Sequence, residues 1–412
     1  MTTLREKIKE LLRPYSNLPK EVYVIFVARI INAMGVLVFP LLTLILVKKI
    51  GLSIAEAGFW ISITGILFGP ASLIGGKLAD TIGRKIIIII FDILGAATYL
   101  VIALIEPSFS MIYLIMLAVF FMGIAQPAHD ALMADLTTPE NRSGAYSLSY
   151  MGFNIGFIIG PVIGGFLFEE YLPLVFLIDG ITALLAVLLV FFFIKETFSK
   201  TKEDLGEDRE LEKRVEGSIF KVLAGRRILL YFALISLGYS FIYSQWTFLI
   251  PIHAEQNFVN EGAKLYGQLS GFNGFIVMVF TPIITMLFAR KKNIRRIVYG
   301  GVLYTVAFGI LGFISTKAIF FFSIFIFTLG EIFVTISSMP FIANHTPASH
   351  RGRMSSIIPM LIGFGHVIGP VVMGGFLTFM SIPTAWKLIG AIILTFAGLM
   401  LLLEKLEEKN IL

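Results

Sequence analysis

The stretch Gly76-Lys-Leu-Ala-Asp-Thr-Ile-Gly-Arg-Lys85 is a short polar segment between two long apolar runs, residues 59–74 and 86–105. With its flanks, each run is long enough to cross a lipid bilayer as a helix. The segment must therefore hold one acid and two adjacent cations at a single membrane surface. Gly83 is expected to adopt the positive φ angle that reverses the chain between the two helices.

The composition of the 412 residues is that of a membrane protein. Hydrophobic residues make up 57% of the chain and charged residues only 15%, whereas soluble domains carry about 25% charged residues. The chain contains 39 Phe and no Cys, so disulfides and thiol nucleophiles are excluded. The first twenty residues are charged and include two prolines, so we expect no cleavable signal peptide.

The apolar runs predict twelve membrane-spanning helices and hence an all-α membrane protein. An even number of spans places both chain ends on one side. Of the 33 Lys and Arg, 27 lie on that side, and this distribution explains the net charge of +6 without nucleic-acid binding. The positive-inside rule then predicts that both termini and the Asp80 loop are cytoplasmic, in a plasma (inner) membrane. The predicted spans are residues 22–47, 56–79, 84–105, 109–134, 144–168, 172–194, 226–252, 265–289, 295–315, 318–342, 353–379 and 384–403.

One long polar segment divides the chain. Residues 195–225 have mixed charge and few apolar side chains, so we expect a solvated cytoplasmic linker. It separates a six-helix bundle in residues 1–194 from a second in residues 226–412. Gly160-Pro-Val-Ile-Gly-Gly165 in span 5 recurs as Gly369-Pro-Val-Val-Met-Gly-Gly375 in span 11, an offset of 209 to 210 residues. This agreement indicates an internal duplication and two pseudo-symmetric bundles.

Small residues also recur four apart along one face of span 5. Gly156, Gly160 and Gly164 leave that face nearly flat, so a neighbouring helix can approach closely. Pro161 removes a backbone hydrogen bond and permits a bend. An ordinary packing face is the alternative interpretation, and we prefer it for the shorter pattern from Gly365 in span 11. For span 5 we expect an interface that moves.

Two of these patterns resemble signatures of the major facilitator superfamily. Residues 76–85 resemble its G-x-x-x-D-x-x-G-R-K loop between spans 2 and 3, although Thr81 stands where a cation is usual. Residues 156–165 resemble its G-x-x-x-G-P-x-x-G-G antiporter signature, which is associated with exporters. Over essentially its whole length the chain resembles the twelve-span drug:proton antiporters of this superfamily. The arginine motif frequent in span 4 of such exporters is missing, which leaves the proton route open.

The resemblance implies two bundles that expose a binding site alternately to the two sides of the membrane. Arg84 is expected to pair with Asp135 at the cytoplasmic end of span 4. Asp80 is expected to face the start of span 11 near Gly352, and this charged cluster would hold one conformational state. The residues expected to take part in the conformational switch are Gly76, Asp80, Gly83, Arg84, Lys85, Asp135, Gly160, Pro161 and Gly164.

Ionisable side chains inside the apolar runs are the candidates for coupling, because burying a charge is costly. Glu331 lies near the middle of span 10, and we expect it to be the protonation site, with Asp130 as runner-up. The alternative is that Glu331 forms structural hydrogen bonds within the second half. Asp92 and Asp179 are expected to be interfacial or capping groups. The residues expected to bind cargo are Arg29, Tyr239, Tyr243, Gln245, Trp246, Met278 and Glu331, although Arg29 equally well reaches the cytoplasmic surface.

The sequence is compatible with three functions to different degrees. The favoured one is export of amphipathic, cationic or lipophilic small molecules in exchange for protons. The second keeps the fold but moves another solute, such as a sugar, a metallophore or a lipid. The third, an enzyme or scaffold, is disfavoured because the sequence shows no metal-ligand spacing, nucleophile elbow or phosphate loop. We therefore expect no enzyme activity, cofactor or metal. The expected partners are a small-molecule substrate, protons and the lipid bilayer, not nucleic acid, and the protein is expected to be a monomer.

Overall fold

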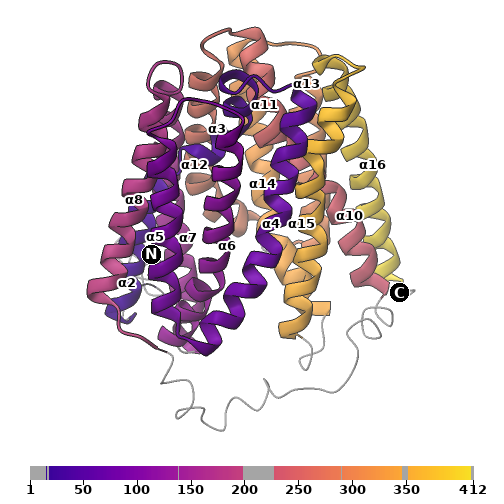
Figure 1. The fold of residues 1–412 in the computed structure, drawn as a ribbon. Coiled ribbons are helices and arrows are strands. Elements are labelled where there is room, and N and C mark those ends of the chain that lie inside the picture. Colours follow the sequence, from indigo (N-terminus) through magenta and orange to yellow (C-terminus); the bar gives the residue numbers. More distant parts are fainter. Residues whose placement is uncertain are drawn as a thin grey trace, which may run out of the picture. The chain divides into compact units, whose positions relative to one another are not determined.

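The computed structural model describes residue 15 and residues 18–137, 139–197, 227–288, 290–345 and 351–409. These residues form helices and their connections, with no strand among them (Figure 1). Eleven helical stretches in the described ranges are long and apolar enough to cross a membrane. They correspond to predicted spans 1 to 8 and 10 to 12. The ninth predicted span is also a helix, Asn293–Ile310, but its first turn carries Arg295 and Arg296.

The helices follow the predicted order with two spans divided into segments. In the first half they are α2 (Lys20–Met34), α3 (Val38–Leu44), the π-helical turn η2 (Ile45–Lys49), α4 (Ile54–Thr81), α5 (Arg84–Ile102), α6 (Ser110–Leu136), α7 (Pro139–Leu167) and α8 (Leu172–Phe193). In the second half they are α10 (Arg227–Tyr243), α11 (Gln245–Asn257), α12 (Gly262–Leu287), α13 (Asn293–Ile310), α14 (Lys317–His345), α15 (Arg351–Phe376) and α16 (Ile382–Glu408).

Contacts group the chain into two compact units. The first unit is drawn from residues 1–42 and 64–205, and the second from residues 43–63 and 206–412. Residues 43–63, which run from the end of span 1 into span 2, therefore group with the second unit, a detail that the duplication alone does not predict. Most of the predicted linker, residues 198–225, lies outside the described residues.

Helix packing repeats between the two units. In the first unit, α5 packs against α6 and α8, and α2 packs against α7 and α8. In the second unit, α13 packs against α14 and α16, and α10 packs against α15 and α16. Numbered by span within each half, these are the same four pairs. The packing thus follows the duplication that the sequence indicates.

Span 1 is interrupted between α2 and α3, and an acid on α8 caps the break. Asp179 Oδ2 accepts hydrogen bonds from the backbone N–H groups of Leu37 and Val38, at 3.2 and 3.1 Å. These donors stand at the start of α3, where no helical carbonyl is available. A Cβ on Gly35 would lie 1.6 Å from Thr182 Oγ1, so the break needs glycine there. The prediction that Asp179 is a capping group is confirmed.

Span 7 is interrupted at the equivalent place. Ser244 separates α10 from α11 and follows Gly35 by 209 residues. A Cβ on Gly369 of α15 would lie 1.8 Å from Ser244 Oγ. A Cβ on Gly160, 209 residues earlier, would lie 2.9 Å from the carbonyl oxygen of Ala33. Each glycine-rich helix therefore packs against the break in the first span of its own unit.

Candidate functional site

The loop between α4 and α5 carries the ion pair that the sequence predicts. Arg84 Nε lies 3.1 Å from Asp135 Oδ2 at the end of α6, and both side chains are largely buried. Arg84 Nη1 also donates to the carbonyl oxygen of Ala79 at 2.9 Å. Thr197 Oγ1 donates to the same Asp135 oxygen at 2.8 Å. The contacts of the guanidinium group therefore include a carboxylate and a backbone carbonyl.

Glu196, which none of the predicted sites includes, caps the start of α5. Its carboxylate accepts hydrogen bonds from the backbone N–H groups of Arg84 at 2.9 Å and Lys85 at 3.0 Å. Gly83 has φ +131°, and a Cβ there would lie 2.6 Å from Glu196 Oε2. The positive φ expected for Gly83 is confirmed, and the close carboxylate is a second reason for glycine. A signal was available: Glu196 follows span 6 on the predicted side of this loop, and a helix start needs acceptors.

The structure gives less support to the predicted roles of the other residues of this loop. Gly75, not Gly76, makes the close helix approach, because a Cβ on Gly75 would lie 2.0 Å from the carbonyl oxygen of Ile124. The nearest contact of a Cβ on Gly76 would be 3.9 Å away. Lys85 Nζ donates to the carbonyl oxygen of Phe191 at 2.7 Å. The side chain of Asp80, and with it the predicted contact near Gly352, lies outside what the structure describes.

The glycine face of span 5 packs against span 1 within the first unit. A Cβ on Gly156 would lie 2.5 Å from the carbonyl oxygen of Ile30, which is too close for any side chain. At Gly164 the nearest atom would be Leu41 Cδ1 at 3.1 Å, the end of a flexible side chain. Helix α7 continues through Pro161 without interruption. The close packing that the spacing predicts is present, and the motion of this interface stays a prediction.

Glu331 on α14 stands in a polar cluster within the second unit, here called the Glu331 centre: Glu331, Tyr243, Asn273 and Thr328. Tyr243 Oη donates to Glu331 Oε1 at 2.9 Å, and Asn273 Nδ2 donates to Glu331 Oε2 at 2.8 Å. Asn273 Nδ2 also donates to Thr328 Oγ1 at 2.8 Å. No lysine, arginine or histidine pairs with Glu331 in the part of the chain that the structure describes. The carboxylate is therefore held by neutral donors.

The structure does not support a cavity wall for three of the predicted cargo residues. Tyr239 is buried, and its hydroxyl donates to the carbonyl oxygen of Ile297. Gln245 is completely buried and donates to backbone and side-chain oxygens of its own helix break. Trp246 is buried against Tyr266 and Phe327. In the structure these three residues lie in the packed interior of the second unit. The sequence could not distinguish this position from a cavity wall, because large side chains near a helix break can fill the interior or line a cavity.

Two further cargo candidates of the second unit, besides Glu331, are more accessible. Tyr243 belongs to the Glu331 centre, and the centroid of its ring lies 6.0 Å from that of His366. Met278 on α12 is exposed. The Glu331 centre thus joins one predicted coupling residue to one predicted cargo residue.

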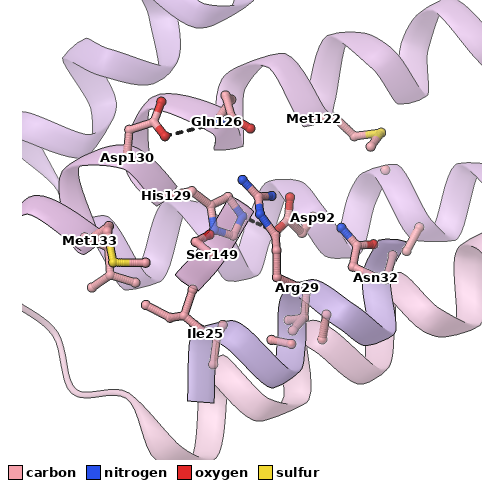
Figure 2. Close-up of a pocket in the computed structure, with 18 of the residues that line it drawn as sticks. Ile25, Arg29, Asn32, Asp92, Met122, Gln126, His129, Asp130, Met133 and Ser149 are labelled. Carbon is pink, nitrogen blue, oxygen red and sulfur yellow. Dashed lines mark hydrogen bonds and ion pairs between the residues drawn. The ribbon is translucent and has the colours of Figure 1, made fainter. Parts of the chain in front are cut away.

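A cavity of about 170 Å³ lies among α2, α5, α6, α7 and α8 of the first unit. Figure 2 shows its polar side chains: Arg29 and Asn32 from α2, Asp92 from α5, Gln126, His129 and Asp130 from α6, and Ser149 from α7. Two positions were left open for Arg29, and in the structure its side chain lines this cavity, whereas its binding of cargo stays a prediction. Both adjacent residues of α6, His129 and Asp130, line this cavity.

The ionisable groups of this cavity differ in their partners. His129 Nε2 and Asp92 Oδ2 are 2.7 Å apart, so Asp92 is a paired cavity residue, and its predicted role as an interfacial or capping group is wrong. Gln126 Nε2 donates to Asp130 Oδ1 at 3.1 Å. Figure 2 shows the Arg29 side chain extending from α2 toward Asp92 and His129. Among the described residues, none forms an ion pair or hydrogen bond with the Arg29 guanidinium group.

Comparisons with known proteins agree with this architecture. A family model described as Major Facilitator Superfamily matches residues 24–370. A Na(+), Li(+), K(+)/H(+) antiporter of Planococcus maritimus is 25% identical over 85% of this chain and 86% of its own. Multidrug resistance protein 1 of Bacillus subtilis (strain 168) is 26% identical over 82% of this chain and 84% of its own. A crystal structure of the peptide transporter POT in complex with sulfate has a TM-score of 0.75, 16% identity and 95% coverage of both chains, and so shows the shared fold. The chain is a multi-pass membrane transporter, not an enzyme, and belongs to the Major Facilitator Superfamily.

Proposed function

We propose that this transporter exports amphipathic, cationic or lipophilic small molecules in exchange for protons, by alternating access of its two halves. The observation that carries the proposal is the Glu331 centre. Its carboxylate has two neutral donors and, among the described residues, no cationic partner. Such a carboxylate can take up either a proton or a cationic group of the cargo. Competition between the two for one site produces antiport.

The names of two relatives support export as the direction of transport and the proton as the exchanged ion. They are named for multidrug resistance and for cation/H(+) antiport. Glu331 also lies at the middle of a span, where carriers of this architecture bind substrates. Asp130 is the second candidate for the coupling group, since it lines the cavity of the first unit.

The cluster of Arg84, Asp135 and Glu196 is proposed to stabilise one conformational state. Its ion pair is largely buried, and removing one partner of a buried pair is costly. Movement of α6 or of the chain after α8 would separate these groups. In the plasma membrane we propose that this cluster and both termini face the cytoplasm, and that one polypeptide suffices for transport.

A second candidate function is exchange of alkali cations for protons. It is favoured by the Planococcus maritimus relative, which is similar over most of both chains. The same carboxylate chemistry serves either cargo, because oxygen ligands also bind small hard cations. The two candidates therefore differ in the size and polarity of the cation and not in the coupling group.

Purified protein in liposomes with an imposed pH gradient tests the proposal. We expect the gradient to drive movement of tetraphenylphosphonium, and we expect the internal pH to change in step with it. Addition of NaCl or KCl in place of the organic cation tests the second candidate. Failure of tetraphenylphosphonium and success of Na⁺ or K⁺ would favour alkali cation exchange. Failure of all three would contradict proton-coupled cation transport.

A further inference from the structure

We propose that His129 and Asp92 form a second proton-binding centre, which sets the charge of the cavity in the first unit. This centre is separate from the Glu331 centre, whose residues belong to the second unit. It therefore goes beyond the proposed function, and it holds whether or not Glu331 couples transport.

The hydrogen bond determines which histidine atom takes up the proton. His129 Nε2 lies 2.7 Å from Asp92 Oδ2. An ionised carboxylate only accepts hydrogen bonds, so Nε2 must carry the hydrogen that joins the two groups. Nδ1 is then the basic nitrogen of the neutral ring. None of the described residues forms a hydrogen bond with His129 Nδ1, so the added proton displaces no existing contact.

The cavity gives this pair access to protons. The side chains of His129 and Asp92 are 28% and 20% exposed, and both line the cavity. Histidine is the side chain whose charge ordinarily changes between about pH 5 and 8. A proton on Nδ1 adds one positive charge to the cavity and replaces a hydrogen-bond acceptor with a donor. A bound cation is then disfavoured, whereas the neutral ring permits it.

The helices that line the cavity carry the charged and titratable groups that face the pair. Arg29 on α2 is a fixed cation, and Asp130 on α6 is an exposed carboxylate held by Gln126. Asp179 on α8 is buried and accepts hydrogen bonds from two backbone N–H groups. The remaining titratable groups of the lining are the phenols of Tyr99 on α5 and Tyr146 on α7, and α4 adds none. Arg29 repels a second positive charge in the cavity, whereas the Asp92 carboxylate attracts it.

His253 in the second unit serves as a comparison, because both of its ring nitrogens form hydrogen bonds. Trp386 Nε1 can only donate, and it lies 3.0 Å from His253 Nδ1, so that nitrogen accepts a hydrogen bond. His253 Nε2 then donates to Ser315 Oγ, also at 3.0 Å. A proton on Nδ1 would break the hydrogen bond from Trp386 in a site that is 1% exposed. The protein therefore contains its own control.

Nitrogen NMR of the full-length protein tests the proposal. Histidine is labelled with ¹⁵N, the protein is placed in lipid nanodiscs, and spectra are recorded from pH 9 to pH 5. The signals of His129 are identified by their loss in His129→Gln. We expect His129 to be in the Nε2–H tautomer at pH 9 and doubly protonated at pH 5, while His253 keeps one neutral tautomer throughout. In Asp92→Asn we expect His129 to populate both neutral tautomers at pH 9, because a side-chain amide can donate as well as accept.

The outcomes separate this proposal from the proposed function. If wild-type His129 stays in one neutral tautomer over the whole range, the second proton-binding centre does not exist. This measurement needs no folded Asp92 variant. If Asp92→Asn folds and leaves the tautomers and titration of His129 unchanged, Asp92 has no part in the centre. Glu331→Gln should leave the His129 titration in place, so failure of the Glu331 proposal would not remove this one.

Discussion

Four carboxylates in the described part of this protein differ in the donors that hold them. Asp179 and Glu196 accept from backbone N–H groups at helix starts, and both act as caps. Asp92 pairs with a histidine, and Glu331 accepts from a phenol and an amide. Backbone N–H groups favour the charged form of an acid and cannot leave. Neutral side chains and histidines can rearrange, and the last two acids are the ones for which we propose proton exchange.

Glu196→Gln should destabilise the protein. The substitution removes the negative charge and one acceptor at the start of α5, a loss of about 1 kcal/mol in the free energy of unfolding. Thermal unfolding of the purified protein followed by circular dichroism measures it. Glu170→Gln is the control, because Glu170 is exposed beyond the end of α7. Equal melting temperatures for the two variants would show that Glu196 is not an effective cap.

Single residues also show how far the sequence could predict the site. Glu331 was predictable because an acid in the middle of an apolar run is conspicuous. Its donors Tyr243 and Asn273 lie on α10 and α12, and the choice of these two follows from tertiary packing that no local pattern records. The same applies to Asp92 and His129, which are 37 residues apart on different helices.

At the scale of elements, the glycine-rich spans pack against interrupted spans in both units. The spacing of four predicted a flat helix face, and the close contacts of Gly156, Gly160 and Gly164 on α7 confirm it. The interruptions of spans 1 and 7 were not predicted. Neither break contains proline, and each depends on contacts from another helix, such as the Asp179 cap. The local sequence therefore predicts the glycine face of the helix but not the interruption of the span that packs against it.

Alanine substitutions should distinguish the positions along these faces. Gly156→Ala forces a Cβ against the backbone of α2 and should cost about 1–3 kcal/mol of stability. Gly164→Ala meets a flexible leucine and should be nearly neutral. Gly363→Ala on α15 is the control, since no atom lies within 4 Å of its Cβ, and it should stabilise by up to about 1 kcal/mol through helix propensity. Melting temperatures that do not follow this order would contradict the packing described for α7.

A larger side chain tests whether the span 5 interface moves. Gly164→Leu should slow or abolish flux while equilibrium binding of tetraphenylphosphonium survives, because the residue packs against span 1 and does not line the cavity of the first unit. Binding is measured by equilibrium dialysis and flux in liposomes. Parallel loss of binding and flux would assign Gly164 to the binding site or to the fold.

At the scale of the whole molecule, the duplication accounts for two similar units, and the charge distribution predicts an orientation in the membrane. Because the chain has no cysteine, single introduced cysteines report the orientation without further engineering. Ser108→Cys between α5 and α6 should react with a membrane-impermeant maleimide added to intact cells. Arg290→Cys between α12 and α13 should react only after the membrane is opened. The reverse pattern would invert the predicted topology.

The central claim is that a proton and the cargo compete for Glu331. The most direct measurement is the pH dependence of gradient-driven tetraphenylphosphonium transport by wild-type protein and by Glu331→Gln in liposomes. Tyr243→Phe serves as the control, because it removes a hydrogen bond from the same centre but keeps the carboxylate. We predict that Glu331→Gln folds and loses the pH dependence, while Tyr243→Phe retains it. Coupled transport by Glu331→Gln with an unchanged pH profile would contradict the claim and direct the search to Asp130.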